Sequence, residues 1–389
     1  MNIATNTCYL EKASALAGIF SEDAVERDRI GGIPKKEKDA IRESGLLHLI
    51  VPQMYGGEGE SWSTVFRLVR EFAKTDPSIA YLYGNHFLQL VNPHLTCSSK
   101  QKAHFYKESV KNDWFWGGCF YPFNKELIGI SEGNRVILNG KKTYSVGSQD
   151  ADRVLISWLE LSDEAGIGGA VIPIDREGVT VNDDWDGIGQ KQTESGTVTF
   201  TNVIVEKNEI LDRNYASISP FSTIGDVLNE LLLANVITGT AEGSLTDAAV
   251  YTKSISHPYP LSEAESNDRD PFVLRKYGDL WIKLQGVISI VEKASRLIDV
   301  AWEKEHALSE EERGQCLLQT DAAHVAATTV GLDITNDIFE VMGEGSADKR
   351  YGLDRFWRNV RTYTLQNPLD HKRKNIGNWL LNDEYTYKV

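Results

Sequence analysis

The sequence predicts a mainly helical α+β protein with an N-terminal helical domain, a central antiparallel β domain and a C-terminal four-helix bundle. Three observations support this class. Helical periods of apolar residues fill residues 1–113. Short β-branched runs separated by turn residues occupy residues 114–212. Longer amphipathic periods return over residues 213–389, and long helices with one wide apolar face predict a bundle.

In the first region, residues 35–49, 78–90 and 99–110 read as helices, and Ser61 is placed to cap another. In the middle region, Asn139-Gly140 predicts a tight hairpin turn between residues 135–138 and 143–146, because both positions tolerate positive φ. Further strands are expected at residues 153–159, 169–174, 179–181 and 197–205.

The last region carries clear helix-start signals. Asp270 precedes Pro271, which suits the first position of a helix. Ser309 and Glu312 have the spacing of a capping box. Before them, one continuous stripe predicts a buried helix face at Val227, Leu228, Leu231, Leu232 and Val236.

Composition narrows the functional classes. The net charge is −15, with 56 acidic and 41 basic residues, which argues against binding a nucleic-acid backbone. The four cysteines form no CxxC pair, and the eight histidines show no ligand spacing, so no metal site is predicted. The N-terminus lacks a signal peptide and no segment is apolar enough to span a bilayer, so a cytoplasmic protein with free thiols is expected.

Aromatic residues are the remaining signal, because phosphate-binding glycine loops and the GxSxG elbow are absent from the sequence. Five of them concentrate in the β region: Trp114, Trp116, Tyr121, Tyr144 and Trp185. Core packing explains each residue taken singly. The group could also wall a flat cofactor, and composition leaves both interpretations open.

Taken together, several motifs resemble the acyl-CoA dehydrogenase superfamily over residues 33–381. They are Val51-Pro52 with Tyr55-Gly56-Gly57, Asn139-Gly140-Lys141-Lys142 with Tyr144, Ala151-Asp152, and the run from Asp354 to Arg361. Within the superfamily the chain is most similar to the dibenzothiophene monooxygenase branch. The matching motifs are Gly45-Leu46-Leu47, Gly59-Glu60-Ser61-Trp62, Gly84-Asn85-His86-Phe87, Asp184-Trp185-Asp186, Gln192-Thr193-Glu194-Ser195-Gly196, Asp270-Pro271-Phe272, Arg358-Asn359-Val360-Arg361-Thr362 and Gly377-Asn378-Trp379.

The branch resemblance implies a two-component monooxygenase that uses reduced FMN from a separate NAD(P)H-dependent flavin reductase. It implies a small organosulfur or amine substrate and, from the usual assembly of the superfamily, a homotetramer. Acyl-CoA dehydrogenases instead need a carboxylate base. Asn367 stands at the usual position of that base, and an amide cannot take up a proton at neutral pH. Gly225 stands at the alternative position, with Asp226 beside it.

The resemblance also assigns catalytic residues. His86 matches one of the histidines that the branch places near the flavin, and two others are replaced by Tyr363 and Gln366. His371 would restore an imidazole if the chain were helical there, because it would share a face with Asn367. Ser145 is the nearest hydroxyl to the position of the superfamily threonine, which is Val146 here. For His86 the alternative is a satisfied core histidine.

Flavin contacts follow by position. Those implied by the resemblance are Cys119, Tyr121, Tyr144, Ser145, Val146, Trp185, Ser195, His257 and Asn367. His257 matches a segment whose arginine holds the flavin phosphate. A histidine there is a weaker and pH-dependent charge, which favours exchangeable FMN over permanently bound FAD. For Tyr144, Ser145 and Ser195 the alternative is ordinary strand packing.

Three functions therefore remain open from sequence. The first is the flavin-dependent monooxygenase. The second is a FAD-dependent acyl-CoA dehydrogenase that uses Asp226 as its base. The third is a flavin-binding protein that has lost catalysis, which would be favoured if His86, Tyr363 and His371 did not converge.

Overall fold

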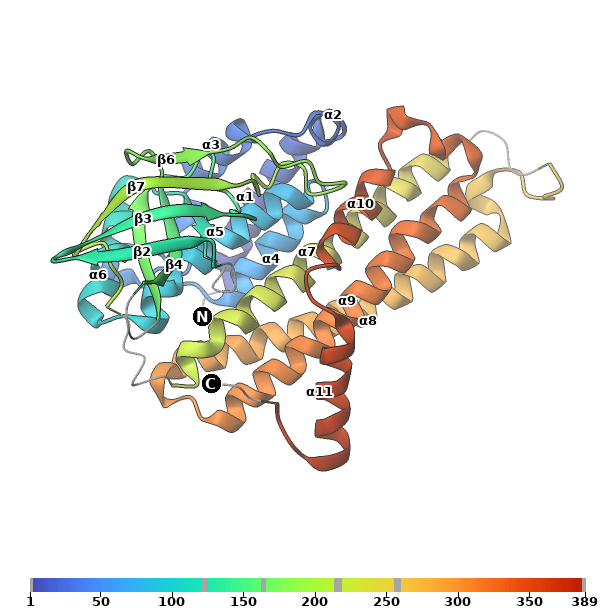
Figure 1. Ribbon diagram of the computed structural model, residues 1–389. Helices are drawn as coiled ribbons and strands as arrows, with labels where there is room; N and C mark the ends of the chain where they lie inside the picture. The colour runs from blue at the N-terminus through green and yellow to red at the C-terminus, as the bar shows by residue number, and fades with distance from the viewer. Residues whose placement is uncertain (1–2, 121–124, 162–165, 213–218, 255–259, 387–389) are drawn as a thin grey trace.

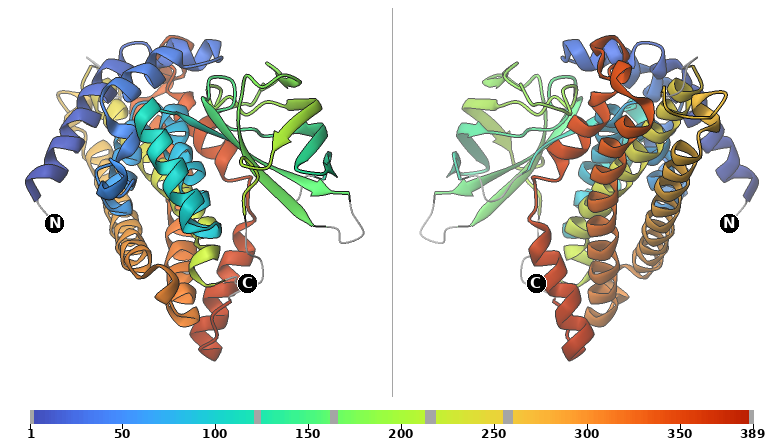
Figure 2. Two further views of the ribbon diagram at one scale, coloured as in Figure 1. Left: turned by 90° about the vertical axis from the view of Figure 1, so that its left-hand side faces the viewer. Right: turned by 90° about the vertical axis from the view of Figure 1, so that its right-hand side faces the viewer.

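The computed structural model describes residues 3–120, 125–161, 166–212, 219–254 and 260–386. Its element order is helices, then strands, then helices, as the sequence predicts. The sheet projects from one side of a helical body, and α11 extends from the bundle at the lower end (Figures 1 and 2). The mainly helical α+β class is confirmed.

The N-terminal helices have the capping chemistry expected from sequence. Ser61 accepts a hydrogen bond from the Thr64 backbone at the start of α4, and Asp76 caps α5. The predicted helix at residues 35–49 is shorter, because Gly45 adopts a left-handed conformation (φ 76°) and a 3-10 turn follows. The helices are α1 (Ile3–Ser21), α2 (Ala24–Ile30), α3 (Lys35–Glu43), α4 (Trp62–Ala73), α5 (Pro77–Thr96) and α6 (Ser99–Asn112).

The β domain is one curled seven-stranded sheet in the order β1-β4-β2-β3-β7-β6, with β5 also paired to β4. Four pairings are antiparallel, and β4 runs parallel to β1 and β2. The strands are β1 (Trp116–Cys119), β2 (Leu127–Glu132), β3 (Arg135–Lys142), β4 (Arg153–Glu160), β5 (Ile167–Pro173), β6 (Val179–Val181) and β7 (Val198–Glu206).

The predicted hairpin at Asn139-Gly140 is wrong. These residues lie inside β3, where the register to β7 shifts between Leu138 and Gly140. Gly140 adopts φ 129°, and a Cβ there would meet the Glu126 carbonyl oxygen at 1.9 Å. The glycine therefore lies at a β-bulge, which, like a tight hairpin turn, requires a residue without a side chain at this position.

The C-terminal helices are α7 (Ile224–Ser254), α8 (Pro271–Lys304), α9 (Glu310–Met342), α10 (Asp354–Tyr363) and α11 (Leu369–Asn382). The predicted caps at Asp270 and Ser309 are both formed, the latter as a capping box. The predicted stripe on α7 is fully buried. Short 3-10 helices connect elements at η1 (Leu46–His48), η2 (Gln53–Tyr55), η4 (Phe221–Thr223), η5 (Asn267–Arg269), η6 (Glu305–Ala307), η7 (Glu344–Ala347) and η8 (Lys349–Tyr351).

Helix α7 lies at the centre of the helical body. Gly239 of α7 lies against α4, and Gly243 lies against the C-terminal end of α4. Cβ atoms added to them would meet the carbonyl oxygens of Arg70 and Lys74, respectively. One apolar core joins α4, α5 and α7, whereas the sheet has a separate core. The division at residues 113 and 212 stays a prediction.

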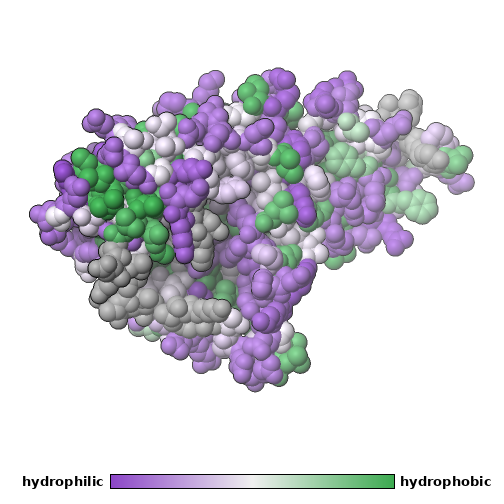
Figure 3. Space-filling view, viewed as in Figure 1, coloured by the Kyte–Doolittle hydropathy of each residue, from purple (hydrophilic) through white to green (hydrophobic). Residues whose placement is uncertain are grey.

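The surface seen in Figure 3 is mainly hydrophilic, in keeping with the acidic composition. Exposed apolar side chains on the sheet include Ile128, Ile130 and Ile204. Over the described residues, the helices are each too short or too polar to cross a bilayer.

Candidate active site

Residues 143–148 connect the end of β3 to β4 and lie between β1 and the segment 193–196. Three backbone hydrogen bonds hold this loop. Gly118 N donates to the Val146 carbonyl (2.9 Å), Ser145 N to the Gly196 carbonyl (3.0 Å), and Gly147 N to the Thr193 carbonyl (3.0 Å). The Val146 carbonyl is thus used within the protein, and its contact with a flavin stays a prediction.

Glycines allow the backbone of β1 to lie close to its neighbours in this region. A Cβ on Gly117 would meet the Gly147 carbonyl oxygen at 2.7 Å, and one on Gly118 would meet the Gln89 side-chain amide at 2.7 Å. Gly147 itself has φ 69°. Glycines without side chains also let a ligand approach the main chain closely, so this region could hold a ligand against backbone groups.

Two of the sequence-predicted aromatic residues pair at the rim of this loop. Tyr144 is 69% exposed, and its ring centroid lies 6.3 Å from that of Trp185 in an edge-to-face arrangement. The indole N–H of Trp185 donates to the Gln190 carbonyl at 2.7 Å, which fixes the ring. By contrast, Trp116 is fully buried in the core. The aromatic cluster therefore divides into packing residues and an accessible pair.

The hydroxyls beneath this rim are buried. Ser145 Oγ donates to the Lys142 carbonyl at 3.2 Å, and Ser195 Oγ lies 2.8 Å from Thr193 Oγ1. Burial raises the pKa of Cys119 to about 11, although a hydrogen bond with Ser145 and the charge of Lys142 lower it. Cys119 is therefore a neutral thiol at neutral pH, and its predicted flavin contact would not be that of a nucleophile.

Tyr363 joins the bundle to the β domain. Its hydroxyl donates to Gln190 Oε1 at 2.5 Å, and its ring lies 4.8 Å from that of Tyr81 on α5. Gln190 N donates in turn to Asn359 Oδ1 on α10. Gln190 is buried and has φ 56°, a strained conformation that hydrogen bonds with Trp185, Asn359 and Tyr363 help to hold in place.

The residues after Tyr363 connect to Tyr81 and α7. Gln366 is exposed at the surface, and its side chain hydrogen-bonds the Tyr81 hydroxyl. Burial raises the pKa of Tyr81 to about 12; the bond to Gln366 lowers it, and the charge of Glu230 raises it. Asn367 Nδ2 donates to Glu230 Oε1 at 2.6 Å. Both sequence-predicted residues therefore lie beside Tyr81 and Glu230.

His86 has the surroundings of a core histidine. The Trp116 backbone N–H donates to its Nδ1 (3.1 Å), so its Nε2–H donates to the Leu47 carbonyl (2.9 Å). Burial lowers the pKa of His86 to about 3, so the ring is neutral at physiological pH. Both ring nitrogens are engaged in joining α5 to β1 and η1.

His371 does not share a helical face with Asn367, because α11 begins only at Leu369 and Pro368 stands at its N-cap. The side chain of His371 is exposed. The neighbouring Lys372 lies inward and contacts Glu230 and Asp321. Among the described residues, His86, Tyr363 and His371 therefore share no contact, which is the arrangement that favours the third function considered from sequence.

Sequence reasoning missed the charged residues that do meet beside Asn367. Glu230 Oε2 lies 2.6 Å from His324 Nδ1 on α9 and 2.9 Å from Lys372 Nζ on α11. Burial acts to raise the pKa of Glu230, but His324 and Lys372 hold it below its usual value. The available signal was a carboxylate inside the most apolar stretch of the sequence; its partners are 94 and 142 residues away.

Unpaired polar atoms in this region fit a cofactor with polar groups. Asn85 Nδ2, Ser148 Oγ and Gln190 Nε2 are buried and have no hydrogen-bond partner among the described residues. Unpaired buried polar atoms cost free energy, so they favour a ligand with complementary donors and acceptors at the flanking glycine backbone. Tyr121 and His257 lie outside the described residues.

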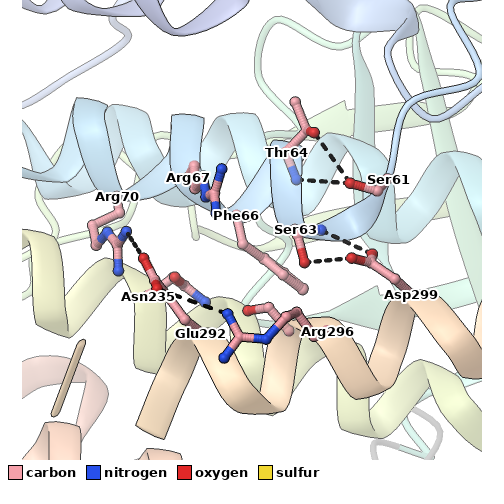
Figure 4. Close-up of a pocket in the computed structure, with 11 residues that line it drawn as sticks. Ser61, Ser63, Thr64, Phe66, Arg67, Arg70, Asn235, Glu292, Arg296 and Asp299 are labelled. Atoms are coloured by element: carbon pink, nitrogen blue, oxygen red, sulfur yellow. Dashed lines mark hydrogen bonds and ion pairs between the residues drawn. The ribbon is translucent and has the colours of Figure 1, made fainter. Parts of the chain in front are cut away.

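A separate cavity of about 140 Å³ lies between α4 and α8 (Figure 4). Arg70 pairs with Glu292 at 3.1 Å, and Asp299 accepts hydrogen bonds from the backbone and side chain of Ser63. Arg67 and Arg296 also line it. The sequence-predicted site residues are not among its lining, so it is distinct from the candidate site.

Comparison with known proteins gives two family matches along the chain. Residues 17–113 match the N-terminal domain of acyl-CoA dehydrogenases, and residues 231–368 match the C-terminal domain of acyl-CoA dehydrogenases. A similar protein is the probable FMNH2-dependent monooxygenase SfnC of Pseudomonas putida. It is 40% identical over 387 residues, covering 99% of this chain and 98% of SfnC.

Two solved structures are also similar. The methanesulfinate monooxygenase MsuC of Pseudomonas fluorescens superposes with a TM-score of 0.94 at 38% identity, over 98% of each chain. FMN-bound TdsC, a dibenzothiophene monooxygenase of Paenibacillus sp. A11-2, superposes with a TM-score of 0.92 at 36% identity, over 97% of this chain and 98% of TdsC. With its motifs, fold and both domain matches in agreement, this chain belongs to the acyl-CoA dehydrogenase superfamily and, within it, to the dibenzothiophene monooxygenase branch.

Proposed function

We propose that this chain is the oxygenase component of a two-component flavin-dependent monooxygenase. It takes reduced FMN from a separate NAD(P)H-dependent flavin reductase and oxygenates a small organosulfur substrate, or an amine. The similarity over nearly the whole length to SfnC, MsuC and FMN-bound TdsC supports this activity and this cofactor. We also propose a cytoplasmic location.

The observation that carries the proposal is the contact between Asn367 and Glu230. Asn367 occupies the position where many acyl-CoA dehydrogenases have their base, and its amide donates to Glu230. The Glu230 carboxylate accepts from Asn367 and pairs with His324 and Lys372, and its pKa is lowered. A carboxylate held in this way is a poor proton acceptor, so dehydrogenation at carbon lacks its usual base.

Reduced FMN would supply the two electrons that reduce O2, with one oxygen atom delivered to the substrate and the other released as water. The protein itself would bind the flavin and keep water away from it. Tyr144 and Trp185 offer ring faces at the rim, and residues 117–118 and 143–148 offer backbone polar groups. Ser145 and Gln366, with the Tyr81 hydroxyl, are the groups proposed to hold a proton or a substrate oxygen.

One observation favours the dehydrogenase alternative. Asp226 lies one helical turn before Glu230 on α7, and desolvation raises its pKa, whereas Arg313 lowers it and Glu230 raises it further. A carboxylate with a raised pKa suits a general base. If Asp226 serves this role, Asp226→Asn abolishes flavin reduction by an acyl-CoA.

The test is to purify the chain, identify any released flavin, and assay it with FMN, NADH, O2 and a flavin reductase on methanesulfinate and dibenzothiophene. We expect exchangeable FMN and formation of an oxygenated sulfur product that depends on the reductase. Tightly bound FAD bleached by an acyl-CoA would support the dehydrogenase instead. Reversible FMN binding without turnover of either probe would support the non-catalytic alternative.

We also propose a homotetramer. Several large apolar side chains of α8 are exposed on the chain, among them Phe272 (79%), Ile282 (66%) and Trp281 (56%). Exposed apolar residues clustered on one long helix favour burial against another copy. Light scattering after size exclusion should give four times the chain mass of 43.5 kDa; a monomer at micromolar concentration would contradict this assembly.

A further inference from the structure

A group of buried and half-buried polar side chains, which we call the Glu230 cluster, joins α7, α9 and α11. It consists of Glu230, Asp321, His324, Lys372 and Asn375. Lys372 Nζ lies between Glu230 (2.9 Å) and Asp321 (3.3 Å). Asp321 also accepts from Asn375 Nδ2 at 3.2 Å. Buried ion pairs contribute little net stability, because desolvation offsets much of their attraction, so the cluster invites a functional explanation.

The cluster contacts the candidate active site through the 2.6 Å hydrogen bond from Asn367 Nδ2 to Glu230 Oε1, and the charge of Glu230 also acts on Tyr81. Four residues before Asn367, α10 ends at Tyr363, whose hydroxyl donates to Gln190. Residues 364–366 therefore lie between two tethers, a buried one to the β domain and a part-buried one to α7. Gln366 lies between these tethers and binds the Tyr81 hydroxyl.

We propose that Glu230 is a positioning residue for the oxygenation site. Through Asn367 it fixes residues 364–367, and so sets where the Gln366 amide and the Tyr81 hydroxyl meet the substrate. This inference rests on the proposed function, because it gives these two groups a substrate to meet. The segment between α10 and α11 has no regular secondary structure. Turn hydrogen bonds from Thr364 N and Gln366 N hold its first part, and the side-chain tether at Asn367 holds its end.

His324 and Lys372 have a specific part in this arrangement. They keep the Glu230 carboxylate ionised, so that the bond from Asn367 is charge-assisted and roughly twice as strong as a neutral one. His324 is almost completely buried on α9, where Glu230 pairs with its Nδ1. His324 therefore places an imidazole beside Glu230, and its contacts lead to the segment 364–367 through Glu230 and Asn367.

Asp321 provides a matched control for this role. It is as deeply buried as His324, lies on the same helix, and pairs with the same Lys372. It makes no contact with Asn367 among the described residues. A purely structural cluster would therefore respond similarly to loss of either carboxylate charge, whereas a positioning role requires Glu230 alone.

The experiment compares Glu230→Gln with Asp321→Asn in the full chain without flavin, by hydrogen exchange of the backbone amides of residues 364–367. We expect Glu230→Gln to speed exchange there by about 10-fold or more, because the lost charge weakens the tether. We expect Asp321→Asn to stay within about 2-fold of the parent chain. Equal acceleration in both variants, or none in Glu230→Gln, overturns the proposal.

A second arm uses turnover with FMN, NADH, reductase and methanesulfinate. Glu230→Gln should release more hydrogen peroxide per oxygenated product, with an effect on kcat rather than on the affinity for FMN, and Asp321→Asn should not. If Glu230→Gln does not fold, Asn367→Ala removes the same tether from the other side and should reproduce both effects. A parent chain that oxygenates no probe refutes the proposed function, while the exchange result still decides whether Glu230 holds this segment.

Discussion

The hydroxyl of Tyr363 donates to Gln190 Oε1 across 2.5 Å, and this bond joins the last helices of the chain to the β domain. Both side chains are buried, and Gln190 keeps its Nε2 without a partner among the described residues. The bond therefore orients an amide whose nitrogen is buried without a partner among the described residues, which favours a ligand acceptor beside it.

We expect Tyr363→Phe to weaken FMN binding and to lower stability by about 1–3 kcal/mol, because the buried Gln190 Oε1 would lose the hydrogen bond that it accepts from Tyr363. Fluorescence titration with FMN and urea unfolding measure the two effects. Tyr83→Phe is the control, since it removes a similarly buried hydroxyl that donates to the Leu46 carbonyl inside the helical core. It should lower stability and leave FMN affinity unchanged. Equal affinities for FMN in Tyr363→Phe and the parent chain would contradict the role of this bond.

The accessible pair Tyr144 and Trp185 predicts a stacking contribution to flavin binding. Trp185→Ala should raise the Kd for FMN by about 10-fold, in line with an aromatic contact of about 1–1.5 kcal/mol. Tyr144→Ala should have a smaller effect in the same direction, because its ring is 69% exposed. Tyr351→Ala removes an aromatic ring from η8 and should not change the Kd. A parent-like Kd in both rim variants would place the flavin elsewhere.

The close approach of Gly117 to Gly147 predicts that position 117 does not tolerate a side chain. Gly117→Ala places a Cβ 2.7 Å from the Gly147 carbonyl oxygen, so the loop of residues 143–148 must shift. We expect loss of FMN binding with the fold retained, as judged by circular dichroism. Gly18→Ala in α1 is the control, because no atom lies within 4 Å of its added Cβ. Helix propensity predicts that this change is neutral or stabilises by up to about 1 kcal/mol.

His86 predicts an acid sensitivity of the fold. Its pKa is lowered to about 3 from a usual value of 6.5 by burial. Between these values the unfolded chain binds more protons than the folded one. The stability contributed by neutral His86 is therefore complete above pH 6.5 and falls as the pH is lowered toward 3, by at most about 1.4 kcal/mol per pH unit.

Urea unfolding at several pH values between 7 and 4 tests this dependence. His86→Gln lacks the titrating group, so its stability should fall less steeply over this range than that of the parent chain. The two curves should differ most at the acidic end. Parallel curves would show that His86 is not held neutral by the fold.

Local chemistry in the sequence determined much of this architecture. Ser61, Asp270 and Ser309 begin helices because their side chains accept from the first free backbone N–H groups, and this requires only neighbours in sequence. The apolar stripe on α7 predicted its buried face, because helical spacing is also set by residues near one another in sequence. The family motifs were also readable, because they are runs of consecutive residues.

Only the tertiary structure decided the long-range contacts of the polar residues. Asn139-Gly140 suits both a hairpin turn and a bulge, and pairing with β7 selected the bulge. His86 received partners from Leu47 and Trp116, and both its ring nitrogens are therefore used in the core. Glu230 meets His324 and Lys372 because three helices pack together, and a sequence pattern carries no record of contacts between residues so far apart.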